Sequence, residues 1–122
     1  METTAKLLEA SLLNIWNDRD DKSRREMMEK IYSADIVFYE SNDGPAFIGH
    51  QAINDLIGKL QAEWPIEFNF TITNSMVNHQ AQYVSWTLGI SGETAVASGA
   101  DIAIIESGKI KSLYLLLNPS DK

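Results

Sequence analysis

Hydrophobic residues recur along this chain at two different spacings. In residues 5–16, 27–32 and 53–64 the apolar positions fall near a period of 3.6, which is the spacing of an amphipathic helix. From residue 67 onward apolar and polar residues alternate, which is typical of strands with one buried face. The pattern therefore predicts helices in the first half and a sheet in the second.

Polar and turn-forming residues mark the predicted ends of the helices. The polar segment 17–21 ends the first helix, and Ser23 with Glu26 three residues later forms a capping box that predicts the start of the second. The third helix opens after Gly49, and Pro65 ends it because the residue before a proline disfavours helical geometry.

The strands are predicted from their residue types and from the turns between them. Residues 36–40 are β-branched, aromatic or acidic and lead into a cluster of turn formers, which indicates a short first strand. A long strand over residues 94–106 meets a last one over residues 110–117 through Ser107-Gly108, a spacing suited to a tight hairpin. Helices followed by strands with short connections predict one α+β domain over residues 1–122, with an antiparallel sheet.

Five short segments, spread over nearly the whole chain, occur in the same order in a known superfamily. They are Trp16-Asn17, residues 32–39, residues 49–53, Trp86, and residues 99–102 followed by residues 108–110. In these segments the chain resembles the nuclear transport factor 2-like superfamily, in its SnoaL-like branch. The resemblance implies a cone-shaped, curved antiparallel sheet of the cystatin-like type, closed by N-terminal helices around a pocket, and frequent dimers.

Charge and composition exclude several classes of function. The formal net charge is -7 and no basic cluster exceeds two residues, which argues against nucleic acid and membranes as partners. The chain has no cysteine and only two, distant histidines, so we expect no metal site. No glycine-rich phosphate loop occurs, and we expect no cofactor. An N-terminus without the features of a secretory signal predicts a cytoplasmic protein.

Two acids are the best candidates for chemistry. Asp101 is the only charged residue between Ala95 and Ile105, a run apolar enough for both strand faces to be covered. Its same-face neighbours at 97, 99 and 103 are small, which leaves room for a ligand. Glu40 shares a strand face with Ile36 and Phe38, so it points to the pocket mouth if they point inward. One carboxyl could then act as base and the other as proton donor.

The superfamily's steroid isomerase resembles this chain more distantly and implies the same two roles. Its catalytic base corresponds to Glu40 and its protonated aspartic acid to Asp101. Its catalytic tyrosine, on the first helix, corresponds to Leu12, so one hydrogen-bond donor is missing here. The alternative is structural: Asp101 is a hydrogen-bonded core acid and Glu40 a solvated strand end.

Aromatic and aliphatic residues at core spacing complete the predicted pocket. Its expected walls are Trp16, Tyr32, Phe38, Phe70, Trp86 and Leu113. They favour a small apolar or polycyclic ligand, either bound or converted by an isomerase, cyclase or dehydratase. The alternative is a non-catalytic module that binds other proteins, since the fold alone does not decide function.

The outward sheet face is apolar where a solvated face should be polar. The residues expected there are Tyr83, Val96, Ile102, Ile104, Tyr114 and Leu116. Burial against a second copy explains such a face, and we predict a homodimer through the convex side of the sheet.

Overall fold

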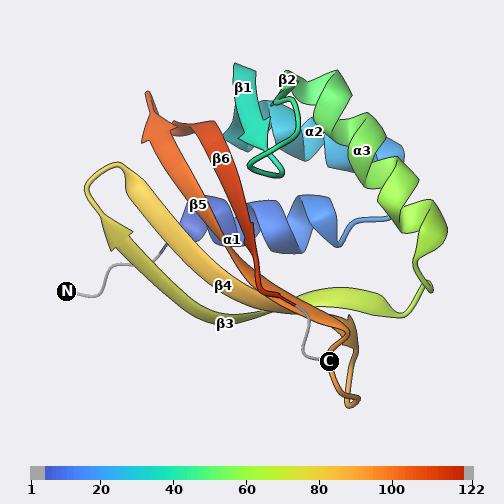
Figure 1. Ribbon diagram of the computed structural model, residues 1–122. Coiled ribbons are helices and arrows are strands. Elements are labelled where there is room, and N and C mark those ends of the chain that lie inside the picture. The colour runs from blue at the N-terminus through green and yellow to red at the C-terminus, as the bar shows by residue number, and fades with distance from the viewer. Residues whose placement is uncertain (1–4, 120–122) are drawn as a thin grey trace.

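A computed structural model describes residues 5–119, and in it helices lie against the concave side of one bent sheet (Figure 1). The helices are α1 (Lys6–Ser11), which continues as one π-helical turn, η1 (Leu12–Trp16), then α2 (Asp21–Ile31) and α3 (His50–Glu63). The strands are β1 (Tyr32–Tyr39), β2 (Phe47–Ile48), β3 (Phe68–Asn78), β4 (Ala81–Ile90), β5 (Ala97–Glu106) and β6 (Lys109–Leu117). The α+β class is confirmed. Of the helices described, none combines the length and the hydropathy that a membrane span needs.

The sheet has the strand order β2-β1-β6-β5-β4-β3. Strands β3 to β6 form an antiparallel meander, and the turn between β5 and β6 has positive φ at both Ser107 and Gly108, as the tight hairpin requires. β1, however, runs parallel to β6, so the expectation of a wholly antiparallel sheet is wrong at this pair. The chain between them contains α3 and three long strands, which is enough to bring it back in the same direction.

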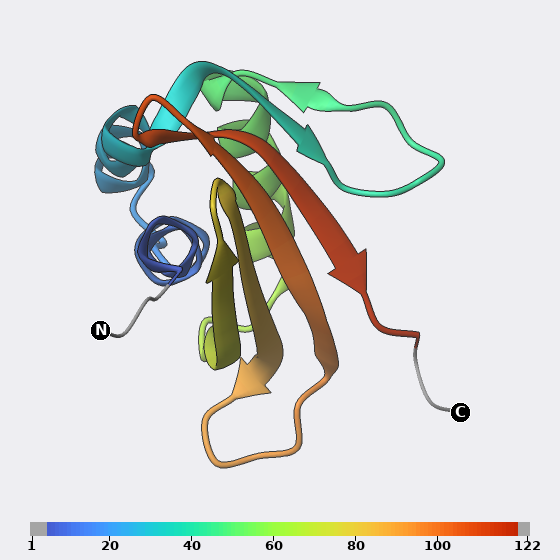
Figure 2. The same ribbon diagram turned by 90° about the vertical axis from the view of Figure 1, so that its left-hand side faces the viewer.

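The sheet bends because its ladders are interrupted. The pairing of β3 with β4 shifts register between Ile72 and Asn74, and that of β5 with β6 shifts between Ile104 and Ile105. Such bulges bend a strand and increase its twist. The long strands therefore curve around α1, which Figure 2 shows nearly end-on beside them. The result is an open cone with its inner surface facing the helices.

The start of α2 differs from the prediction. The helix begins at Asp21, and Asp20 caps it: the backbone N–H of Ser23 donates to Asp20 Oδ2 at 2.9 Å. The predicted capping box of Ser23 and Glu26 is wrong, because an acidic residue three positions earlier already supplies the oxygen that the free N–H needs. The hydroxyl of Ser23 donates to Asp18 instead.

Buried polar contacts fix the helices that later form the walls of the site. Arg24 is buried between α2 and α3, where its Nε donates to Asn54 Oδ1 at 2.7 Å and its Nη1 donates to Gln61 Oε1 at 2.8 Å. At the end of η1, the Asn17 amide donates to the carbonyl of Phe70 at 3.0 Å and accepts from its N–H at 2.7 Å. These contacts tie α3 to α2 and tie η1 to the edge strand β3.

Candidate functional site

A cavity of about 280 Å³ lies between the concave sheet face and the helices. Every long strand contributes to it, as do η1 and α3, so its walls come from all parts of the chain. The lining residues are Leu12, Trp16, Phe38, Glu40, Leu60, Trp64, Phe68, Phe70, Trp86, Leu88, Val96, Ala97, Asp101, Leu115 and Leu117. All but two of them are apolar, and the two exceptions are the acids proposed from the sequence.

The aromatic walls hold one another in place. Trp16 packs edge-on against Phe38 with ring centroids 5.5 Å apart, and Phe70 packs edge-on against Trp86 at 5.0 Å. Trp64 meets Phe70 in the same manner at 5.9 Å. Edge-to-face packing is the favoured geometry for aromatic pairs. The cavity therefore has a preformed aromatic wall, which needs no ordering when a ligand enters.

Asp101 is the buried acid of the cavity, with 5% of its surface exposed. Trp86 Nε1 donates to its Oδ1 at 3.1 Å, and Oδ2 accepts no hydrogen bond from residues 5–119. Burial raises the pKa of this carboxyl to about 7, against the weaker opposing effect of the Trp86 bond. Asp101 can therefore be protonated near neutral pH. The sequence offered two interpretations of this residue, a hydrogen-bonded core acid and an acid beside a ligand pocket. The structure combines them, because Asp101 is bonded in the core and also borders the cavity.

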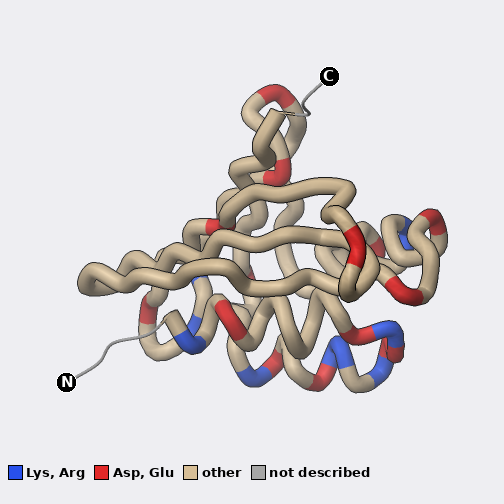
Figure 3. The backbone as a smooth tube through the Cα atoms, turned by 90° about the horizontal axis from the view of Figure 1, so that it is seen from below, with Lys and Arg blue, Asp and Glu red and all other residues tan. Residues whose placement is uncertain are grey.

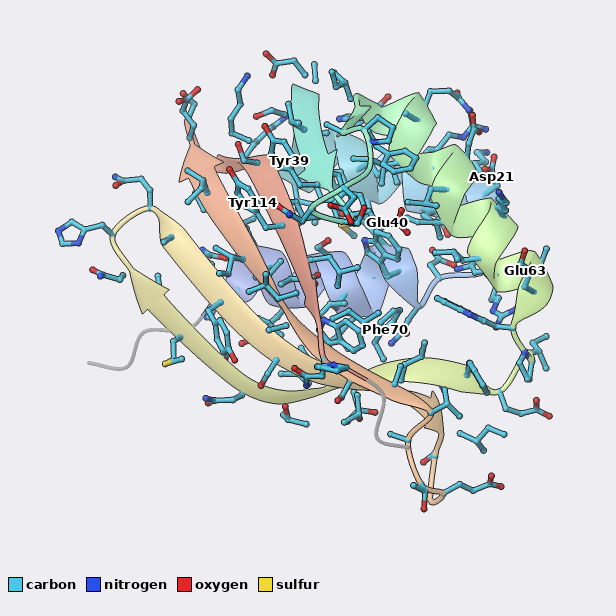
Figure 4. The ribbon with its side chains drawn as sticks, in the orientation of Figure 1. Asp21, Tyr39, Glu40, Glu63, Phe70 and Tyr114 are labelled. Carbon is cyan, nitrogen blue, oxygen red and sulfur yellow. The ribbon has the colours of Figure 1, made fainter. Side chains whose placement is uncertain are left out.

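Glu40 lies at the outer end of the site. It follows the last residue of β1, is half-buried, and borders both the cavity and a shallower hollow beside α3. Figure 4 shows Glu40 below the end of β1 and Phe70 on β3 farther down. The two acids thus border the same cavity, although 61 positions separate Glu40 from Asp101 in the sequence.

The space beside Asp101 does not arise from small side chains at positions 97, 99 and 103, as the sequence predicted. A Cβ at Gly99 would lie 2.6 Å from the carbonyl oxygen of Leu116 and 3.0 Å from the Trp86 ring, so the neighbouring strand and the indole already occupy that space. Ala103 is fully buried in the core. Of the three small residues, only Ala97 borders the cavity. Sheet curvature, more than small side chains, creates the space.

Two predicted wall residues lie in the core beside the cavity. Tyr32 is fully buried, with its hydroxyl 2.6 Å from Ser11 Oγ and 3.3 Å from Trp16 Nε1, and burial raises its pKa to about 12. Leu113 is also fully buried, opposite Ala103 in the β5–β6 pair. Neither borders the cavity itself. The structure brings Trp16, Phe38, Phe70 and Trp86 to its wall.

Several residues of the cavity wall were not predicted from the sequence, although the periodicity of some of them already indicated a buried face. Trp64 closes the apolar stripe of α3, and Phe68 alternates with Phe70 in β3. Val96 was expected on the outer face, but it precedes β5, outside the alternation of that strand, and lines the cavity. Leu12 also lines it, so an aliphatic side chain occupies the place where the steroid isomerase carries its tyrosine.

Comparison with known proteins identifies the family to which the chain belongs. A family model described as a SnoaL-like domain matches residues 10–113. The chain belongs to the SnoaL-like family. A search of curated proteins gives no match. Among solved structures of similar fold is a candidate isomerase of this family from Agrobacterium tumefaciens, with TM-score 0.82 and 19% identity, covering 93% of this chain and 96% of the other.

Two further neighbours of similar fold differ more in sequence. A candidate SnoaL-like polyketide cyclase from Jannaschia sp. has TM-score 0.77 and 11% identity, covering 93% of this chain and 83% of that one. A protein with a ketosteroid isomerase-like fold from Catenulispora acidiphila, in complex with trimethylamine, has TM-score 0.68 and 16% identity, covering 93% and 85%. At these identities the likeness concerns the fold alone.

Proposed function

We propose that this SnoaL-like protein binds a small, largely apolar molecule in the cavity between its sheet and its helices. The observation that carries the proposal is a buried carboxyl, Asp101, with one oxygen bonded to Trp86 and the other facing no protein donor among the described residues. A cavity of about 280 Å³ with aromatic walls and few polar groups is typical of small-molecule sites. A neighbour of the same fold forms a complex with a small organic molecule, trimethylamine.

The same two acids support proton-transfer chemistry. Glu40 lies at the exposed end of the cavity, where an ionised carboxylate can take a proton from a carbon next to a carbonyl group. Asp101, when protonated, can donate a hydrogen bond to the carbonyl oxygen as negative charge develops there. Return of the proton from Glu40 to another carbon completes an isomerisation. Structural neighbours named as a candidate isomerase and a candidate cyclase are consistent with such chemistry.

A role as a protein-binding module without catalysis is the alternative. The two functions differ in what they require of the interior, because an adaptor needs its outer surface and has no need of open space inside. The cavity that reaches both Glu40 and Asp101 favours the small-molecule function.

Two measurements test the proposal in sequence. A thermal-shift screen with small aromatic and polycyclic compounds should raise the melting temperature for a subset of them, because a ligand that binds only the folded state stabilises it. Ala97→Phe, which fills the cavity wall, should abolish the shift. Once a substrate is found, Glu40→Gln and Asp101→Asn should each reduce turnover, whereas Glu106→Gln, an exposed acid at the end of β5, should not. Unchanged turnover in both variants refutes the acid-base scheme.

The outer sheet face supports a homodimer. Tyr83, Ile102 and Tyr114 align across three strands, and Tyr39 stacks on Tyr114 with ring centroids 4.7 Å apart (Figure 4). Ile104, Tyr114 and Leu116 are 36%, 39% and 52% exposed. Strands β3 and β4 carry no charged residue, and Figure 3 shows the charges gathered mainly on helices and loops. The lack of charge on these two strands keeps close like-charge contacts out of the interface between two chains of net charge -7.

A further inference from the structure

A second, more open hollow adjoins the cavity at Glu40. This outer hollow of about 620 Å³ lies beside α3 and is lined by Glu40, Phe47, Asp55, Lys59, Leu60 and Glu63, with Ala52 and Leu56. Glu40 and Leu60 border both spaces. We call the outer hollow the approach, because a molecule that reaches the cavity past α3 meets its side chains first.

This approach is acidic. Glu40, Asp55 and Glu63 face it with a single cation, Lys59. None of the three carboxylates forms an ion pair within residues 5–119, and Asp55 is bonded only to the neutral amide of Gln51, at 2.7 Å. Among residues 5–119, no lysine or arginine lines the inner cavity. In a chain of net charge -7, a concave region with this lining attracts cations and repels anions.

The interior is suited to a positive charge as well. Six aromatic rings line it, three of them indoles, from Trp16, Trp64 and Trp86. An indole face is the best aromatic partner for a cation. Asp101 adds a buried carboxyl whose Oδ2 has no donor among the described residues, and an ammonium N–H would make a charge-assisted bond with it.

We propose that the molecule bound in this cavity is an organic cation, an amine or quaternary ammonium compound with an apolar body. Its positive group lies in the inner cavity between Glu40, Asp101 and the indole rings, having passed the acidic approach. This rests on the proposed function, because it names the chemical class of the ligand for the same site. A neutral polycyclic compound would suit the walls but would leave the carboxylates without a counter-charge, and an anion would be repelled.

The test compares two molecules of equal shape. Benzyltrimethylammonium and neopentylbenzene differ only in that a charged nitrogen replaces a carbon. Binding to the intact protein is measured by tryptophan fluorescence at pH 7 and low salt. We expect the cation to bind about tenfold more tightly than its neutral counterpart, since cation–π contacts and nearby carboxylates favour only the former.

Variants with equal net charge separate a local effect from a global one. Asp55→Asn combined with Glu63→Gln removes two exposed acids of the approach, and Asp43→Asn combined with Glu67→Gln removes two exposed acids elsewhere. The first pair should weaken binding of the cation roughly threefold and leave neopentylbenzene unchanged, and the second pair should change neither.

The outcomes distinguish the two proposals. If the neutral compound binds as tightly as the cation, the cationic ligand is refuted while the apolar pocket stands. If both variant pairs weaken the cation equally, the local role of the acidic approach is refuted. If neither compound binds, and the thermal-shift screen also finds no ligand, the proposed function itself fails.

Discussion

The buried carboxyl of Asp101 makes stability depend on pH in an unusual direction. Its pKa is about 7 in the folded protein, against an ordinary value of 3.8. Below that ordinary value both states hold the proton, and Asp101 adds no pH dependence. Between the two values the unfolded chain releases the proton while the folded protein keeps it, so the free energy of unfolding falls as the pH rises. At about 1.4 kcal/mol per pH unit, the loss by pH 7 is roughly 4 kcal/mol.

Asp101→Asn removes this ionisation and preserves the shape of the side chain. The amide oxygen can still accept from Trp86 Nε1, but the NH2 group takes the place of Oδ2, which has no partner among residues 5–119, and an unpaired buried donor costs about 1–3 kcal/mol. At pH 4 the variant should be less stable than the wild type by that cost. At pH 8 it should be more stable by about 1–3 kcal/mol, because the wild type has lost roughly 4 kcal/mol.

Urea unfolding followed by circular dichroism from pH 4 to pH 8 measures this change. A stability difference between Asp101→Asn and wild type that stays constant with pH would refute the desolvation argument. Asp35→Asn is the control, since Asp35 is exposed and the hydrogen bond from Lys111 lowers its pKa. A lowered pKa contributes stability that is present above the ordinary value of 3.8 and is lost only below it, so the stability difference between Asp35→Asn and wild type should stay nearly constant from pH 4 to pH 8.

Three further substitutions test the fold and the assembly. Gly99→Ala places a Cβ 2.6 Å from a β6 carbonyl oxygen and should lower the free energy of unfolding by about 1–3 kcal/mol, measured by urea titration. Asn17→Ala leaves the N–H and carbonyl of Phe70 without their side-chain partner and should cost about 1–3 kcal/mol in the same assay; no change would mean that η1 is not held by this contact. Tyr114→Glu puts a charge on the convex face and should convert a dimer to a monomer in analytical ultracentrifugation, whereas a wild type that is monomeric at micromolar concentration refutes the dimer.

Local patterns were enough to locate most elements. The apolar stripe of α3 and the turn at Ser107-Gly108 depend on contacts between near neighbours, and both match the structure. The inward orientation of Asp101 was also readable, since one charge within a long apolar run must face either a partner or a cavity. The cap of α2 was misread because Asp20 and Ser23 both carry suitable oxygens, and backbone geometry chooses between them.

Local patterns in the sequence were sufficient to predict the α+β class, the order of the main elements and the two acids worth testing. Local patterns could not predict the parallel pairing of β1 with β6, the wall formed by Trp64 and Leu117, or the place of Glu40 between the cavity and the acidic approach. The difference lies in how far apart the contacting residues are in the sequence. Helix and strand periodicity reflect which face of one element is buried, whereas a cavity depends on how strands far apart in the chain bend around the same space.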